Sequence, residues 1–338
     1  MRNVPLFGAI LVRGWLGLFL IAALAVPAAK GADTLALDQL LSAVVQIKTV
    51  IHPDGRTVGS LGRNREGSGI VIDDDGLILT IGYLMVEAQA AEVITNEGRA
   101  VPANVVGYDH QSGIGLLRAI VPLKVQPLAL GRSADLKEQE AVAIAAYGGA
   151  GRVAPAVVVA KREFAGSWEY LLDEAIFTSP PFRDWSGAAL ISHAGKLVGV
   201  GSLVVGDASG RGDGVAGNMF VPIDVLAPIL ADLIADGRIS GPGRPWIGVT
   251  TQEAHGSLMV AAVTPGGPAQ RAGLQRGDVI VGVGGAAPKD MADFYRKLYA
   301  QGAAGVTIGL DVQRDDQRQR FDVKSMNRLD HLRLKSTL

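Results

Sequence analysis

Short apolar runs separated by glycine-rich or acidic turns fill the chain from Leu41 to about residue 200, and they constrain the fold more than any other feature. Strands this short and evenly spaced, with almost no helical periodicity between them, favour a barrel or a sandwich. The 44 glycines agree with a chain rich in turns. The pattern predicts strands at residues 42–50, 67–72, 77–80, 91–95, 101–106, 114–118, 141–146, 153–161, 170–177, 189–192 and 196–200.

The last third of the chain is organised differently. A helix is expected at 225–235, with Asp224 as its cap and Gly237 at its end. The Gly/Pro-rich segment 238–245 then predicts a linker between two domains, at 35–237 and 246–325. The second domain should contain a helix at 290–300, with Phe294 and Leu298 in its core, and strands at 246–251, 258–263, 278–283, 306–313 and 318–323. Residues 326–338 are basic and are expected to form a flexible tail.

The N-terminus has the pattern of a secretory signal. Arg2 and Arg13 precede an apolar run at 15–26, and small residues follow it. This run is about as long as the apolar region of a signal and shorter than the ~20 residues of a spanning helix. The pattern predicts a signal peptide at 1–31, cleaved near 28–31, with an uncleaved membrane anchor as the alternative. Either way, the body of the protein is expected in the periplasm or outside the cell.

Composition excludes several classes of function. The net charge of −1 gives no reason to expect a nucleic-acid partner. Cysteine is absent, which excludes disulfides, thiolate catalysis and cysteine-based zinc sites. The five histidines are scattered without metal-ligand spacing. No metal and no cofactor are therefore predicted.

Several motifs together resemble the HtrA (DegP-like) family, in which a secreted trypsin-fold protease precedes a PDZ domain. Residues 67–80 resemble the GSGFVI…DGYILT hairpin, and Ser186-Gly187 with Leu190 resembles the GNSGGPL nucleophile loop. Residues 244–249 resemble the R-x-Y-L-G-V strand. The most specific match is 263–280, which is similar to VxPGSPAxxAGLxxGDVI. The resemblance implies an all-β, trypsin-like double β-barrel followed by a PDZ domain, a β-sandwich with two helices.

The departures from the family's motifs bear on activity. Tyr83 stands where the resemblance places the general-base histidine, and Gly113 stands at the position of the orienting aspartate. Ser186 keeps the nucleophile position. Asp184 replaces a glycine at the oxyanion-hole position, which the family forms from backbone N–H groups there and at Ser186. A tyrosine with an ordinary pKa of about 10 is a poor proton acceptor near neutrality. The sequence therefore predicts that Ser186 is inactive.

Other side chains near these positions have competing interpretations. Tyr83 is expected to fill the space of the lost imidazole and to bond to a neighbour. His110, beside Asp109, is a weaker alternative as a substitute base. His193 is most simply a surface residue at a hairpin tip. Trp185 could lie exposed in a cleft or pack inside the protein.

The second domain predicts a peptide-binding site. The resemblance implies that the backbone N–H groups of Trp246, Ile247, Gly248 and Val249 face a C-terminal carboxylate, and that the strand after them pairs with the peptide. Met291 and Tyr295 are expected near a side-chain pocket, or else only in the core.

These features predict a periplasmic, HtrA-like pseudoprotease that binds the C-termini of proteins or peptides, or that modulates an active protease or an envelope complex. The alternative is an active serine endopeptidase in envelope protein quality control. A holdase chaperone, which would bind unfolded chains without preferring C-termini, is a third hypothesis. A homotrimer is implied only by the resemblance.

Overall fold

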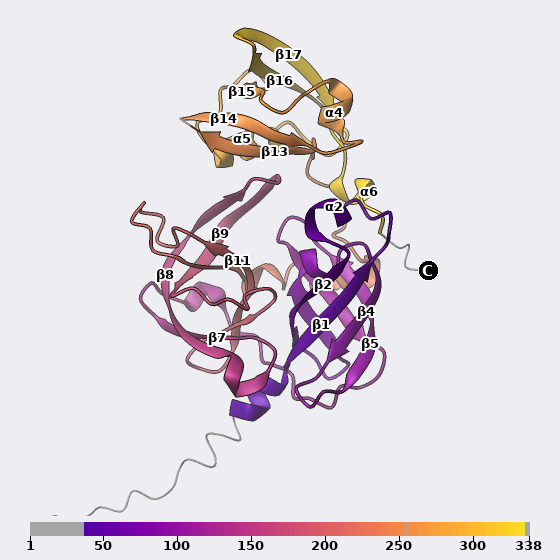
Figure 1. Cartoon of the computed structure of the whole chain (residues 1–338), viewed down its shortest axis with the longest axis vertical. Coiled ribbons are helices and arrows are strands. Elements are labelled where there is room, and N and C mark those ends of the chain that lie inside the picture. The colour runs from indigo at the N-terminus through magenta and orange to yellow at the C-terminus, as the bar shows by residue number, and fades with distance from the viewer. Residues whose placement is uncertain (1–36, 255, 335–338) are drawn as a thin grey trace, which may run out of the picture.

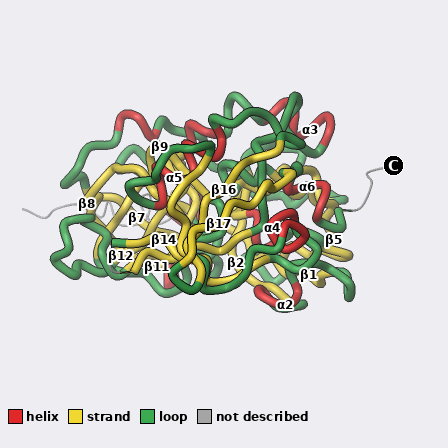
Figure 2. Tube along the Cα trace, turned by 90° about the horizontal axis from the view of Figure 1, so that it is seen from above, coloured by secondary structure: helices red, strands yellow, loops and turns green. Residues whose placement is uncertain are grey.

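The computed structural model describes residues 37–254 and 256–334, so the expected signal segment at 1–31 and its cleavage point lie outside the described residues. Two closed six-stranded barrels stand side by side, and a five-stranded sheet with two helices sits above them (Figure 1). Seen from above, strands β14, β16 and β17 of this third unit lie over the junction of the two barrels (Figure 2). Within the described ranges, no helix is long and apolar enough to cross a membrane.

The first barrel closes in the order β1-β2-β3-β6-β5-β4. Its interior is aliphatic, and side chains such as Ile47, Ile78 and Leu116 are fully buried. The strands match the expected runs to within a few residues. They are β1 (Val44–Ile51), β2 (Asn64–Val71), β3 (Leu77–Ile81), β4 (Ala88–Ile94), β5 (Ala100–Tyr108) and β6 (Ile114–Ala119).

The second barrel closes in the order β10-β11-β12-β9-β8-β7. Its members are β7 (Ala141–Ala145), β8 (Val153–Gly166), β9 (Tyr170–Ser179), β10 (Ala189–Ile191), β11 (Leu197–Val205) and β12 (Gly217–Pro222). β12 was not expected, because its sequence GNMFVP opens with two residues that disfavour strands and ends in proline. β8 continues five residues past its predicted end, and the long β8–β9 hairpin reaches up to the third unit (Figure 1).

Short helical turns occupy the connections of the barrels. The helix expected at 225–235 is a turn, η4 (Ile223–Val225), followed by α3 (Leu230–Asp236). Asp224 does not cap it, because its carboxylate accepts the N–H groups of Ser133 and Ala134 at 3.0 and 2.8 Å. Gly237 ends α3 with a positive φ of 70°, as predicted. The remaining turns are α2 (Val58–Leu61), η1 (Gly82–Leu84), η2 (Ser133–Asp135) and η3 (Gly149–Arg152).

The third unit is a sheet in the order β13-β14-β15-β16-β17, with β13 at one edge. Phe294 and Leu298 are fully buried in its core, as expected. Asp290 caps α5 by accepting the N–H of Asp293. The elements are β13 (Val249–Ala254), β14 (Ser257–Val263), α4 (Pro268–Ala272), β15 (Val279–Val283), α5 (Met291–Tyr299), β16 (Thr307–Arg314) and β17 (Gln317–Lys324).

The segment after β17 is not a flexible tail over its described part, 326–334. It forms α6 (Arg328–His331), capped by Asn327, which accepts the N–H of Leu329. The backbone N–H of Arg333 donates to Glu87 of the first barrel at 2.8 Å. Charged and polar side chains of this segment make specific hydrogen bonds to the folded domains, which the basic composition did not reveal.

Candidate functional site

Ser186 lies in the connection between β9 and β10, as the nucleophile motif predicted. The loop is held tightly against the first barrel, because the N–H of Ser68 donates to the Ser186 carbonyl at 2.8 Å. Gly187 has a φ of 71°, and a Cβ there would lie 2.0 Å from the carbonyl oxygen of Ser68. Only glycine fits this close approach. The serine is therefore presented between the two barrels on a fixed turn.

Tyr83, in η1, occupies the place predicted for it beside Ser186. Its hydroxyl lies 2.9 Å from Ser186 Oγ and 2.9 Å from the carbonyl oxygen of Ser202. A phenol has one proton, and a carbonyl can only accept. The phenol is therefore the donor towards both oxygens, and its one proton is shared between Ser186 Oγ and the carbonyl oxygen of Ser202. Burial raises the pKa of Tyr83 to about 12, so the phenol stays protonated at neutral pH.

The position expected for the orienting acid holds Gly113 with a φ of 79°. Its carbonyl accepts the N–H of Gly82 at 2.7 Å, which fixes the turn that carries Tyr83. A Cβ on Gly113 would lie 3.2 Å from the Tyr170 hydroxyl. The space around the acid position is thus partly filled by a tyrosine from the second barrel.

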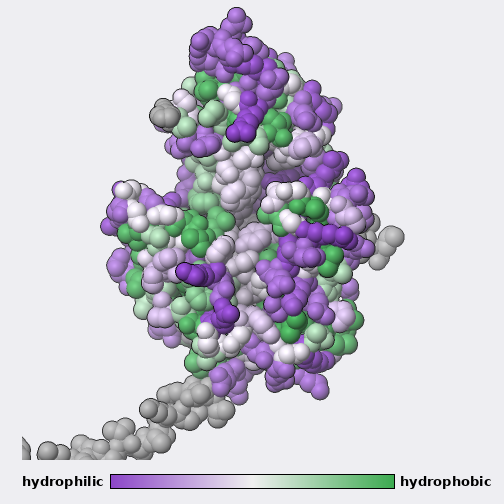
Figure 3. Space-filling model, in the orientation of Figure 1, coloured by the Kyte–Doolittle hydropathy of each residue, from purple (hydrophilic) through white to green (hydrophobic). Residues whose placement is uncertain are grey.

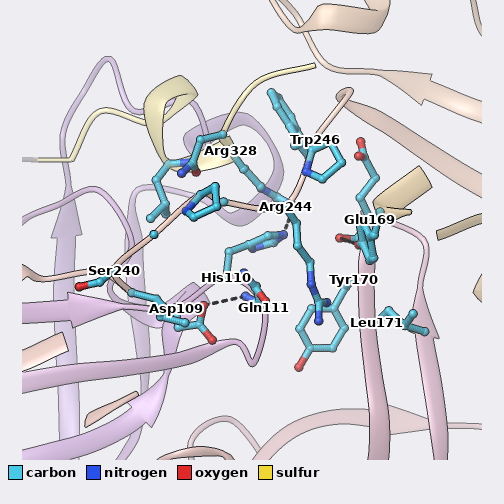
Figure 4. Close-up of a pocket in the computed structure, with 18 residues that line it drawn as sticks. Asp109, His110, Gln111, Glu169, Tyr170, Leu171, Ser240, Arg244, Trp246 and Arg328 are labelled. Atoms are coloured by element: carbon cyan, nitrogen blue, oxygen red, sulfur yellow. Dashed lines mark hydrogen bonds between the residues drawn. The ribbon is translucent and has the colours of Figure 1, made fainter. Parts of the chain in front are cut away.

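His110 is not placed to act as a substitute base. Its Nδ1 lies 2.8 Å from the Tyr108 hydroxyl, and its Nε2 accepts from Arg328 at 2.6 Å. Burial, and then the nearby Arg328 charge, lower the pKa of His110 well below its ordinary value. The imidazole is neutral and faces a cavity between the barrels and the third unit, lined also by Glu169, Arg244 and Trp246 (Figure 4).

The cleft around Ser186 is polar. Asp184, at the oxyanion-hole position, forms an ion pair with Arg152 at 2.5 Å, so its charge is partly balanced. Trp185 is half-buried and lines the cleft together with Arg183 and Tyr147. The space-filling view shows a hollow between the barrels, below the third unit (Figure 3). His193 is exposed at its hairpin tip, as expected.

The predicted carboxylate-binding loop at the start of the third unit is occupied by the chain itself. The backbone N–H groups of Ile247, Gly248 and Val249 donate to the carboxylate of Glu169 at 2.9, 2.6 and 2.8 Å. Trp246 lies at the start of the loop, and its own N–H donates to Met326 instead. Glu169 comes from the turn between β8 and β9, in the second barrel. The sequence did not predict this contact.

The same turn also fills the groove beside the loop. The N–H of Thr251, in edge strand β13, donates to the carbonyl of Ser167 at 2.8 Å. From the opposite wall, the Tyr295 hydroxyl donates to the carbonyl of Gly166 at 2.8 Å. Tyr295 was expected near the pocket or in the core. It is fully buried, and it lies in the core while its hydroxyl reaches the groove. Met291, at the start of α5, is half-buried.

Glu169 is only 3% exposed. Burial raises its pKa to about 7, against the opposing effect of the three N–H donors and the charge of Arg328. Arg328 also donates to the carbonyl of Trp168 at 2.8 Å and so ties α6 to the same turn. Within the described residues, no group of three or more His, Asp or Glu side chains could hold a metal ion.

Comparison with known proteins agrees with this architecture. A family model described as "Trypsin-like peptidase domain" matches residues 67–200, and one described as "PDZ domain" matches residues 245–325. The solved structure "HtrA-type protease AlgW with decapeptide" is 20% identical, with a TM-score of 0.51, over 90% of this chain and 99% of that one. That likeness concerns the fold. The predicted fold class, a trypsin-like barrel domain followed by a PDZ domain, is confirmed.

Curated relatives are named as serine proteases. The "Probable periplasmic serine endoprotease DegP-like" of Pseudomonas fluorescens is 32% identical over 273 residues, which cover 76% of this chain and 55% of that protein. The "Putative serine protease HhoA" of Synechocystis sp. is 27% identical over 283 residues, which cover 77% of this chain and 70% of that protein. The chain spans about half the length of the first curated relatives it matches.

Proposed function

We propose that this chain, which joins a trypsin-like peptidase domain to a PDZ domain as HtrA-type proteases do, is a pseudoprotease of the periplasm that binds protein C-termini. The observation that carries the proposal is the hydrogen bond between Tyr83 and Ser186. Within the described residues, it is the one hydrogen bond that the Ser186 hydroxyl makes. A serine nucleophile needs a neighbouring base to take its proton.

Among the residues that the structure describes, none beside Ser186 supplies such a base. A phenol with a pKa near 12 cannot accept a proton at neutral pH, and Gly113 offers no carboxylate to orient or stabilise a cation. The folds of proteases are shared by proteins without their activity, so the names of the relatives do not decide the matter. The geometry supports a binding role better than a hydrolytic one.

The PDZ domain supplies the binding chemistry. Three convergent backbone N–H groups next to an edge strand are the arrangement that captures the carboxylate of a peptide C-terminus. The periplasmic location follows from the predicted signal segment and from the names of the relatives. The partner would be an envelope protein, or an active protease or complex that this chain modulates, and a homotrimer is proposed by resemblance alone.

The test is labelling of the purified mature protein with a fluorophosphonate, beside Ser186→Ala, with casein turnover measured in parallel. We expect neither labelling nor turnover above the Ser186→Ala background. Labelling and turnover that both disappear in Ser186→Ala would refute the proposal. They would establish the alternative, an active endopeptidase with an unrecognised base.

A further inference from the structure

We infer that the peptide groove of this PDZ domain is closed by a resident ligand, the turn Ser167–Trp168–Glu169 of the second barrel. A partner with a free C-terminal carboxylate then binds only by displacing the Glu169 carboxylate. The partner's chemistry rests on the function proposed above, whereas the closed state of the groove rests on the contacts of this chain alone.

The turn reproduces both parts of C-terminal peptide recognition. Its carboxylate accepts the three N–H groups of the loop, as a terminal carboxylate would. Two residues earlier, its Ser167 carbonyl accepts the N–H of Thr251 on the free edge of β13, as the backbone of an added strand would. The side chain of Glu169 thus replaces a chain terminus at a place where the chain itself continues.

The surroundings are built to hold the turn in this position. Tyr295 accepts the N–H of Glu169 at 3.2 Å while it donates to Gly166, and Tyr299 donates to the Glu169 carbonyl at 3.2 Å. Arg328 holds the carbonyl of Trp168 from the other side. Glu169 itself adopts a φ of 59°, which a residue other than glycine rarely does. The carbonyl groups of residues 166–169 and the N–H of Glu169 are therefore all engaged.

An internal ligand competes more strongly than its contacts alone suggest. It is part of the same chain, so its effective concentration is on the order of millimolar or higher. The apparent Kd of an external peptide is the intrinsic Kd divided by the fraction of molecules in which the groove is open. Weak binding by the intact chain is therefore expected even for a well-matched peptide.

Two substitutions at Glu169, compared with two control substitutions, distinguish opening of the groove from a general loss of stability. Glu169→Ala removes the carboxylate, and Glu169→Lys places a group that only donates opposite three other donors. Asp173 offers the matched control, because it lies on the same hairpin in β9, is exposed, and its side chain makes no hydrogen bond or ion pair among the described residues. Asp173→Ala and Asp173→Lys change the charge equally without touching the groove.

The first experiment is hydrogen–deuterium exchange of the full-length mature chain without ligand. We expect the amides of Ile247, Gly248, Val249 and Thr251 to be protected in the wild type. In both Glu169 variants they should exchange at least about tenfold faster, and in the Asp173 variants they should be unchanged. Equal exchange in the wild type and in Glu169→Ala, with both folded by circular dichroism, would overturn the inference.

The second experiment is fluorescence polarisation with pools of fluorescein-labelled decapeptides that end in Val, Ile, Leu or Phe, each as the free acid and as the amide. We expect the free acids to bind Glu169→Ala at least about tenfold more tightly than the wild type, and the amides not to bind. Equal affinity for both proteins would refute the resident ligand and leave C-terminal binding intact. Faster exchange in Glu169→Ala without binding of any peptide would support the resident ligand and refute C-terminal binding.

Discussion

The Tyr170 hydroxyl donates a 2.6 Å hydrogen bond to the carbonyl of Ser112, the residue before the glycine at the expected acid position. Tyr170 is also the residue that follows Glu169, so one short segment contacts both the PDZ loop and the loop that carries Gly113. A tyrosine of the second barrel therefore closes the expected acid position.

Tyr83→His should not restore labelling of Ser186 by a fluorophosphonate, since no acid would orient the new imidazole. Adding Gly113→Asp should destabilise the fold by about 1–3 kcal/mol, because the residue has a positive φ and its Cβ would meet the Tyr170 hydroxyl. Labelling and chemical denaturation measure the two effects. Tyr83→Phe is the control for loss of the phenol, and labelling of Tyr83→His alone would contradict the prediction.

Closure of the groove should depend on pH with a definite sign. Burial raises the pKa of Glu169 to about 7 in the closed state, so closing takes up a proton. Closure is then favoured most below the ordinary pKa of a free glutamate, about 4.3, and the advantage is lost as the pH rises towards 7. Exchange of the Ile247–Val249 amides, corrected for the intrinsic rate, should show less protection at pH 8 than at pH 5.

The other titratable groups around Glu169 determine which variant is the control for that measurement. Arg328 and Arg244 are the cations that face this carboxylate, and the pKa values of Tyr295 and Tyr299 are raised by burial. His110 stays neutral because burial lowers its pKa. Glu169→Ala should therefore remove most of the pH dependence, and a profile that persists unchanged in this variant would assign it to another group.

Arg328→Ala should loosen the PDZ domain from the barrels. It would leave the carbonyl of Trp168 and the Nε2 of His110 without their donor, at a cost of about 1–3 kcal/mol in the free energy of unfolding. It should also raise the pKa of His110. Thermal unfolding and histidine NMR titration measure these effects. Arg211→Ala, on an exposed loop, is the matched control and should change neither.

Glu87 holds the C-terminal segment to the first barrel. Although burial opposes it, hydrogen bonds from Thr57 and from the N–H groups of Arg333, Thr57 and Arg56 keep its pKa below its ordinary value. Its contribution to stability is therefore present above that ordinary value and lost as the pH falls through the lowered one. Glu87→Gln should flatten the acid limb of the stability profile, measured by urea unfolding between pH 3 and pH 7 (about the range in which a glutamate titrates). An unchanged limb would place the acid sensitivity elsewhere.

Alternation and turn residues were enough to predict most of the barrel strands, since burial of one face fixes a period of two. β12 was missed because its burial comes from its position between β9 and β11, not from its own composition. The order at residues 326–334 was missed for a similar reason. Arg328 and Arg333 appear in the sequence as solvated charges, and their partners are more than 150 residues away along the chain.

For the site, the motifs placed Tyr83 beside Ser186 and the loop at Trp246–Val249, because both positions are local to strands with clear signals. The N–H of Trp246 is the part of that loop prediction that was wrong, since it donates to Met326. Glu169 could not be predicted in the same way. It is separated from its three donors by 78 to 80 residues, and a lone acid in a Ser-Trp-Glu turn is usually a solvated residue. The length of β8, which shows in the structure that the hairpin leaves its barrel, was itself underestimated by five residues from the sequence.

The origin of Glu169 in a neighbouring domain has a practical consequence. Expressed without the barrels, the PDZ fragment would present an empty loop that the whole molecule does not offer. A ligand screen on such a fragment would overstate affinity by the factor that the missing hairpin contributes. Weak peptide binding by the intact chain would then not show that the peptides tested have the wrong C-terminal sequence.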